Sequence, residues 1–454
     1  MKRAGRLLRL APGFLAASVR RDWPLAGLAL LGLAPGVAAL VAWLQIAWRV
    51  RELSYSAAQF GWILPPALLD AVTPAGVLVG TGLVTLLVGC LGLSNAYLAS
   101  VERRLDDLAL LLSLGLSRLE LTSLLLLEAM GLAALGTFFG VLLGLALSVV
   151  SWLPARDYLG LEPGFRLFFW PFVIGALAGL LATLLFVGVT GISTGLRPLS
   201  VLSLRPRKHW MRDWGQWRFS TLGILFTGVL TLLLGVLAVG WQAGVTLAIL
   251  AVVLATLLNV GSWLLTRFYW RLPEPANWPL WALAVQGLAR HRRQTAGMTL
   301  AMTAGALGVG LAALGWVSGD VPATFPLWVA AMLLVACASL VLTTSALAAL
   351  ERRQELGLLA ALGARRSRVR GLILLENGIV AVAGGMLGAM LAVVAWSLVG
   401  SEASQTRAAT VAAIALLDVM AALTTAWIGA LPVLWLIARQ PPAASLRDQP
   451  WLTG

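Results

Sequence analysis

The stretch ERRQELGLLAALGARRSRVRGLILLE, residues 351–376, lies between two long apolar runs, and the organisation of the chain follows from it. From Ser345 to Leu362 the apolar residues recur at three- and four-residue spacing, which predicts a helix that continues out of the membrane. Gly363 is expected to end this helix, because glycine tolerates the left-handed cap. The basic segment from Arg365 to Arg370 then leads into the next apolar run. A short surface helix between two spanning helices is suited to docking a soluble partner.

A weaker copy of this stretch, ERRLDDLALLLSLGLSRLELTSLLLLE, occupies residues 102–128. Both copies begin with Glu-Arg-Arg, contain Leu-Gly near the middle and end with glutamate. The first copy is one residue longer before its Leu-Gly. We therefore expect the chain to contain an internal repeat with one docking segment in each half.

The composition excludes an ordinary soluble protein. Mean hydropathy is +0.90, 60% of the residues are hydrophobic and 11% are charged. Apolar runs of roughly twenty residues can each cross a bilayer core of about 30 Å. The net charge of +14 is interpreted as arginines gathered in cytoplasmic loops rather than as nucleic-acid binding. Cys90 and Cys337 both lie inside apolar runs, so no disulfide framework and no metal site is expected.

Ten membrane spans are predicted, and their charge pattern is consistent with one topology. The basic residues concentrate in alternate loops, which predicts that both termini are cytoplasmic. The basic, amphipathic segment before the first span has no small-residue cleavage site, so it is interpreted as a retained interfacial helix. The spans are expected at 24–47, 76–99, 121–152, 168–192, 219–240, 243–266, 296–317, 326–349, 371–398 and 408–437.

The expected fold is an all-α polytopic membrane protein with two four-helix repeats. Residues 1–210 form the first half, residues 211–270 an inserted two-helix hairpin and residues 271–454 the second half. A hairpin keeps the second half in the same orientation as the first. The outer loops are short: the loop from Arg49 to Pro74 has about 26 residues and its counterpart fewer than ten, so no large extracytoplasmic domain is expected.

The two copies resemble the FtsX-like (MacB-type) permease domain of ABC transporters. That family has a Glu-Arg-Arg-x-Glu segment followed by Ala-Leu-Gly-Ala and a glycine-rich helix that begins near Leu-Leu-Glu. The resemblance implies two FtsX-like halves fused in one chain, each docking one copy of a separate ABC ATPase. It implies coupling roles for Glu102, Arg103, Arg104, Gly115 and Arg118 in the first half, and for Glu351, Arg352, Arg353, Glu355, Gly363, Arg365 and Arg366 in the second.

Equivalent helices of the two halves share small residues at four-residue spacing, which lets helix backbones approach closely in lipid. Two interpretations are open: packing within each four-helix half, or a central interface between the halves. The residues are Gly136, Gly140 and Gly144 in the first half, and Gly384 and Gly388 in the second. Glu128 and Glu376 occupy equivalent places and are expected to hold the docking segment against the arginines.

The chain carries no expected catalytic site of its own. An ATP site needs a glycine-rich loop with a lysine, and neither Lys2 nor Lys208 follows one. ATP–Mg is therefore expected to bind the partner ATPase, with no cofactor in this chain. The histidines, His209 and His291, lie in arginine-rich cytoplasmic segments, away from an outward Ser318. Asp418, about ten residues into the last span, is either functional or hydrogen-bonded to a neighbouring helix.

These features predict a permease subunit in a bacterial plasma membrane. With such short outer loops, the expected cargo is a hydrophobic or amphipathic molecule taken from the bilayer, such as a lipid, lipoprotein, peptide or drug. The alternative is a mechanotransmitter that regulates a membrane or envelope partner without transporting anything. Expected partners are two copies of an ABC ATPase, membrane lipid and an envelope or accessory protein, with no nucleic acid.

Overall fold

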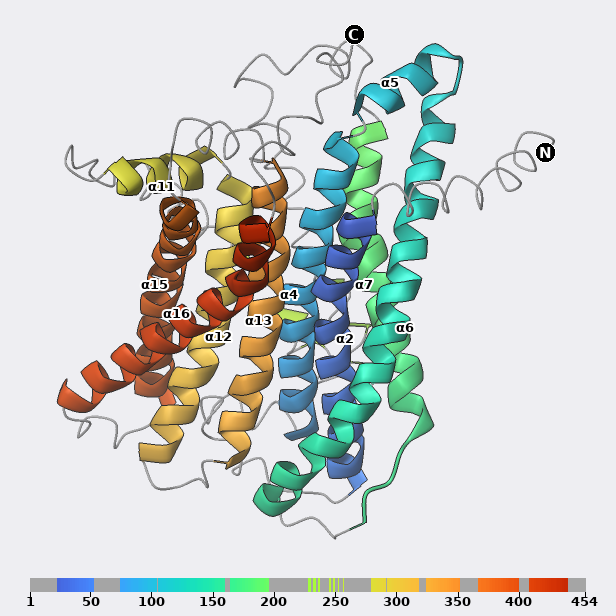
Figure 1. Cartoon of the computed structure of the whole chain (residues 1–454). Helices are drawn as coiled ribbons and strands as arrows, with labels where there is room; N and C mark the ends of the chain where they lie inside the picture. Colours follow the sequence, from blue (N-terminus) through green and yellow to red (C-terminus); the bar gives the residue numbers. More distant parts are fainter. Residues whose placement is uncertain are drawn as a thin grey trace. The chain divides into compact units, whose positions relative to one another are not determined.

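The computed structural model is helical, with no strand in the residues that it describes (Figure 1). The chain divides into two compact units. The first contains Met1–Gly61 and Pro66–Leu257, and the second contains Trp62–Pro65 and Leu258–Gly454. The described residues are 23–52, 74–103, 105–159, 164–195, ten single residues between 228 and 256, 279–290, 292–317, 324–351, 366–399 and 408–439.

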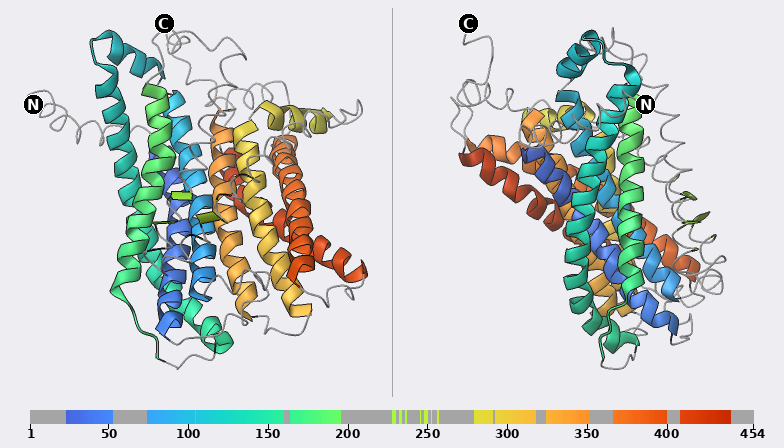
Figure 2. Two further views of the ribbon diagram at one scale, coloured as in Figure 1. Left: turned by 180° about the vertical axis from the view of Figure 1, so that it is seen from behind. Right: turned by 90° about the vertical axis from the view of Figure 1, so that its right-hand side faces the viewer.

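Helix α2 (Trp23–Glu52) is the central helix of the first unit. It packs against α4 (Pro74–Arg103), α6 (Arg118–Leu159) and α7 (Phe169–Gly195), while α7 also contacts α4 and α6. The short α5 (Leu105–Ser113) joins α4 to α6 at one end of the bundle. Figure 2 shows these helices from two further sides.

The second unit repeats this arrangement helix by helix. Its central helix, α12 (Arg292–Val317), packs against α13 (Thr324–Glu351), α15 (Arg366–Val399) and α16 (Ala408–Arg439). Helix α16 also contacts α13 and α15, as α7 contacts α4 and α6. The additional α11 (Pro279–Arg290) packs on α15 and α12 through its buried Ala284, Val285 and Leu288. The sequence did not predict α11 as a helix.

The all-α polytopic prediction is confirmed. In the described part of the chain, six helices are long and apolar enough to cross a membrane, and α4 and α7 contain shorter apolar segments. Together they match eight of the ten predicted spans, and most of them extend a few residues beyond the predicted ends. The other two, 219–240 and 243–266, lie mostly outside the described residues. Gly228 there lies against the side chain of Val252, as antiparallel neighbours would. The boundaries at 210 and 270 also lie outside the described residues and stay predictions.

The glycine stripes are covered by helices of their own units. Gly136, Gly140 and Gly144 of α6 face side chains of α2, so closely that an added Cβ would approach within 2.6–2.8 Å of Leu33, Val37 and Val41. In the second unit, Gly384 and Gly388 of α15 face Met302 and Ala306 of α12 in the same way, at 2.5 Å. The stripes therefore pack each half internally, in agreement with the first of the two interpretations.

A methyl group added to a glycine stripe should destabilise its half. Gly388→Ala would place its Cβ 2.5 Å from the Cβ of Ala306 and 2.8 Å from the carbonyl oxygen of Thr303. We expect a cost of about 1–3 kcal/mol, as for other overpacked sites. The matched control on the same helix is Gly371→Ala, where an added Cβ meets nothing within 4 Å. Unfolding of the purified chain in mixed micelles would measure both, and equal stability of the two variants would contradict the packing described here.

Candidate functional site

The first docking segment is a sharp corner between α5 and α6. Helix α5 ends at Ser113. Gly115, two residues later, has a left-handed conformation (φ 97°) and begins the corner. The amide of Leu116 donates to the carbonyl of Leu111 at 3.2 Å, and that of Gly115 donates to Leu112 at 3.1 Å. These two bonds form the Schellman motif, which satisfies the last carbonyls of a helix and fixes the direction in which the chain leaves it.

A capping box starts α6 two residues later. The side chain of Glu120 accepts hydrogen bonds from the backbone amide of Ser117 at 2.9 Å and from its hydroxyl at 2.8 Å. In return, the amide of Glu120 donates to the Ser117 hydroxyl oxygen at 3.3 Å. Because both sides of the turn have their backbone groups satisfied, the corner has a single local geometry.

The corner is anchored on one side and exposes leucines on the other. Leu108 and Leu112, one helical turn apart, are buried and fix α5 to its own unit. Leu110, Leu114 and Leu119 are 59%, 74% and 81% exposed. Large exposed apolar side chains beside charged residues mark surfaces that contact a partner or a membrane. The sequence analysis did not single out these leucines, because the pattern alone does not show which face of α5 is buried.

The structure describes only part of the predicted docking residues. In the first half, Glu102 and Arg103 end α4, Gly115 lies in the turn and Arg118 begins α6, whereas Arg104 lies outside the described residues. In the second half, Glu351 ends α13 and Arg366 begins α15. Arg352, Arg353, Glu355, Gly363 and Arg365 lie outside the described residues. The second docking segment is therefore framed by its two helices, and its coupling role stays a prediction.

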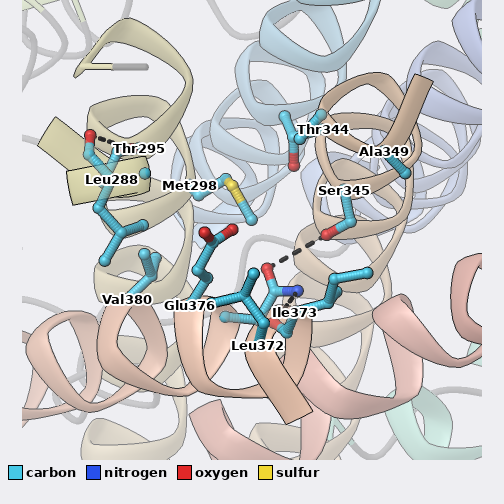
Figure 3. Close-up of a pocket in the computed structure, with 13 residues that line it drawn as sticks. Leu288, Thr295, Met298, Thr344, Ser345, Ala349, Leu372, Ile373, Glu376 and Val380 are labelled. Atoms are coloured by element: carbon cyan, nitrogen blue, oxygen red, sulfur yellow. Dashed lines mark hydrogen bonds between the residues drawn. The ribbon is translucent and has the colours of Figure 1, made fainter. Parts of the chain in front are cut away.

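The two repeated glutamates have different surroundings. Glu128 is buried in the first unit, at 5% exposure. Glu376 is partly exposed and lines a pocket of the second unit, next to Asn377 and Met298 (Figure 3). Their predicted role in holding the docking segment against arginines stays a prediction.

Asp418 is buried inside the helices of the second unit. Its side chain faces Gly310 of α12 and lies near Ala392 of α15, and the residue is 0% exposed. Neither carboxyl oxygen has a hydrogen-bond partner in the part of the chain that the structure describes. Of the two interpretations open from the sequence, a hydrogen bond to a neighbouring helix is thus not observed there.

Two bundles with the same helix neighbours define a polytopic membrane protein with an internal repeat. A sequence model of the FtsX-like permease C-terminal domain matches residues 79–195 and 327–442, more than half of the chain. The chain belongs to the FtsX-like permease family, and it is a membrane protein of the ABC transporter permease type. No curated protein and no solved structure matches it significantly. The central helices α2 and α12 precede the matched regions.

Removing the Asp418 carboxyl should not destabilise the chain. A buried polar group without partners costs about 1–3 kcal/mol, so Asp418→Ala is expected to be at least as stable as the parent. Gly310→Ala should be destabilising, because its Cβ would lie 2.5 Å from Oδ2 of Asp418. That cost should shrink in the double variant, since the two sites are in contact. Unfolding in mixed micelles checks this. A clear loss of stability in Asp418→Ala would mean that the acid has a partner.

Proposed function

We propose that this chain is the membrane subunit of an ABC transporter, and that it couples a separate ATPase to export or extraction of a hydrophobic or amphipathic molecule. Two ATPase copies would dock, one on each docking segment. The observation that carries the proposal is the α5–α6 corner: a capped turn with exposed leucines, continuous with the long α6. It supports a rigid surface on which an ATPase can push.

Helix α6 offers a direct path from the corner into the membrane. It has 42 residues, about 63 Å of helix, which is longer than a bilayer core requires. At its glycines, the backbone of α6 packs against side chains of α2. A tilt or shift of α6 must therefore displace α2 as well. The equivalent path in the second half would run from its docking segment through α15 to α12.

The partner ATPase would supply the energy by hydrolysing ATP. The chain contains two lysines, Lys2 and Lys208, and neither follows a glycine-rich phosphate-binding loop. ATP–Mg would therefore bind the ATPase, and this chain would contribute no nucleotide chemistry. The arginine-rich loops favour a plasma membrane location with both termini on the ATPase side.

The cargo is expected to enter from the bilayer. Neither of the two outer loops that relatives use for large domains is long enough here to fold as one. A molecule that is already in the membrane needs no such domain for capture. The cargo class therefore includes lipids, lipoproteins, hydrophobic peptides and drugs.

Loss of the docking residues should uncouple the ATPase without unfolding the chain. Two variants test this: Arg103→Ala with Arg118→Ala and Leu114→Ser in the first half, and alanine at Arg352, Arg353, Arg365 and Arg366 in the second. Surface substitutions usually change stability by about half a kcal/mol or less, so insertion should survive. Co-purification of the ATPase and its stimulated turnover should fall sharply, with the stronger effect in the second half.

The matched control is Arg156→Ala. Arg156 lies at the opposite end of α6 and forms an ion pair with Asp157 at 2.9 Å. Inserted docking variants that retain the ATPase and full stimulated turnover would overturn the proposal and leave these arginines as topology signals attracted to anionic lipid. Normal coupling without movement of any lipidic cargo in vesicles would instead favour the mechanotransmitter alternative.

A further inference from the structure

Asp418 is an isolated acid in the middle of a spanning helix. It is the one ionisable residue in the apolar stretch Thr410–Trp435 of α16. The residue is 0% exposed, and neither carboxyl oxygen has a hydrogen-bond partner among the described residues. An acid at such a depth is costly, and it marks a functional site more often than a structural one.

The neighbours of this carboxyl are apolar or lack a side chain. Gly310 of α12 lies against Oδ2 of Asp418, and Ala392 of α15 lies beside the same glycine. Ala392 belongs to a buried apolar cluster with Leu314 and Ile414. These neighbours offer the carboxyl neither a side-chain donor nor a charge of opposite sign.

The charged groups of the packed helices lie far from Asp418, near the helix ends. Counted along each helix from the level of Asp418, they are at least about 24 Å away at 1.5 Å per residue. They are Arg293, 17 residues from Gly310 on α12; Glu351, 21 residues from Ala330 on α13; Glu376, 16 residues from Ala392 on α15; and Arg439, 21 residues along α16. Cys337 of α13 is closer, but its thiol donates to the carbonyl of Ala301 at 2.9 Å.

This environment restricts the ligand that the carboxyl can take. A Cβ added at Gly310 would lie 2.5 Å from Oδ2 of Asp418 and 2.7 Å from the Cβ of Ala392, so this side of the carboxyl has no room for a methyl group. A carboxylate that is desolvated without a counter-charge costs far more free energy to bury than the neutral acid. A proton removes the charge and needs no added space.

We propose that Asp418 is a proton-binding site, which holds its proton while α12, α15 and α16 are packed around it and exchanges it with water when they separate. Water supplies the proton, the carboxylate oxygen forms the O–H bond, and the negative charge is lost; release is the reverse. Protonation therefore favours the packed arrangement of these helices, and ionisation favours the open one. The corresponding helix of the first half, α7, contains no ionisable residue. The inference stands on the packing of the second unit, whether or not the chain transports cargo.

The test is an infrared spectrum of the purified full chain in nanodiscs of ether-linked phosphatidylcholine, which has no ester carbonyl to hide a carboxyl band. A protonated carboxyl has a carbonyl stretch that an ionised one lacks. At neutral pH we expect this band in the parent chain and its loss in Asp418→Asn, which keeps the shape of the side chain but has no carboxyl. The matched control is Asp157→Asn, because Asp157 is exposed and paired with Arg156, and it should leave the band unchanged.

Transfer into D₂O then measures how closed the site is. The band shifts as deuterium replaces the proton, and we expect a slow shift because Asp418 is 0% exposed. Gly310→Ala disturbs the packing and should speed the shift about tenfold or more, whereas Gly371→Ala, whose Cβ meets nothing within 4 Å, should not.

Three results would overturn the proposal: equal bands in the parent and in folded Asp418→Asn, a shift that is complete as soon as D₂O is added, or an unchanged rate in folded Gly310→Ala. If Gly310→Ala does not fold, the Asp418→Asn comparison and the exchange rate of the parent chain decide.

Discussion

The contact on which the structure depends is the close approach of α6 to α2, and of α15 to α12, at glycine. Lipid tails are as apolar as leucine, so helices in a membrane associate through close packing rather than through the hydrophobic effect. The absence of a Cβ at Gly140 and Gly388 lets a neighbouring helix lie where a side chain would otherwise be. The central helix of each half is held by the helix that leads to the docking segment, so under the proposed function the contact that builds the fold would also carry motion.

Much of the fold could be predicted, because the dominant constraint in a membrane protein is simple. Each span must be apolar and long enough to cross the bilayer. Six of the described helices follow this rule, and α4 and α7 contain shorter apolar segments. The capped turn at Gly115 follows from an equally local rule. Helix α11 was missed because its twelve residues form neither a span nor a long periodic pattern, and its apolar face is recognisable only once α12 and α15 are in place.

The candidate sites were harder to predict because they depend on contacts between distant segments. The pocket beside Glu376 is lined by residues of α11, α12, α13 and α15, which are far apart in the sequence. Likewise, the carboxyl of Asp418 faces Gly310 and Ala392, which lie far from it in the sequence and, among the described residues, leave its oxygens without a hydrogen-bond partner. The exposed leucines of the corner could not be distinguished from core leucines before the orientation of α5 was known.

The halves share a fold but differ in detail. The first half has the tyrosine-filled interior and the Ser117–Glu120 capping box, where the second has Arg365 and Arg368. The second half has the pocket beside Glu376 and the fully buried Asp418.

The central claim is that one chain supplies two complete permease halves, each with its own ATPase docking segment. The most direct test is the mass of the intact complex, purified from cells with its co-expressed ABC ATPase and measured by native mass spectrometry. The account predicts one copy of this chain with two copies of the ATPase. A complex of two chains with two ATPases would contradict it, because each chain would then dock a single ATPase.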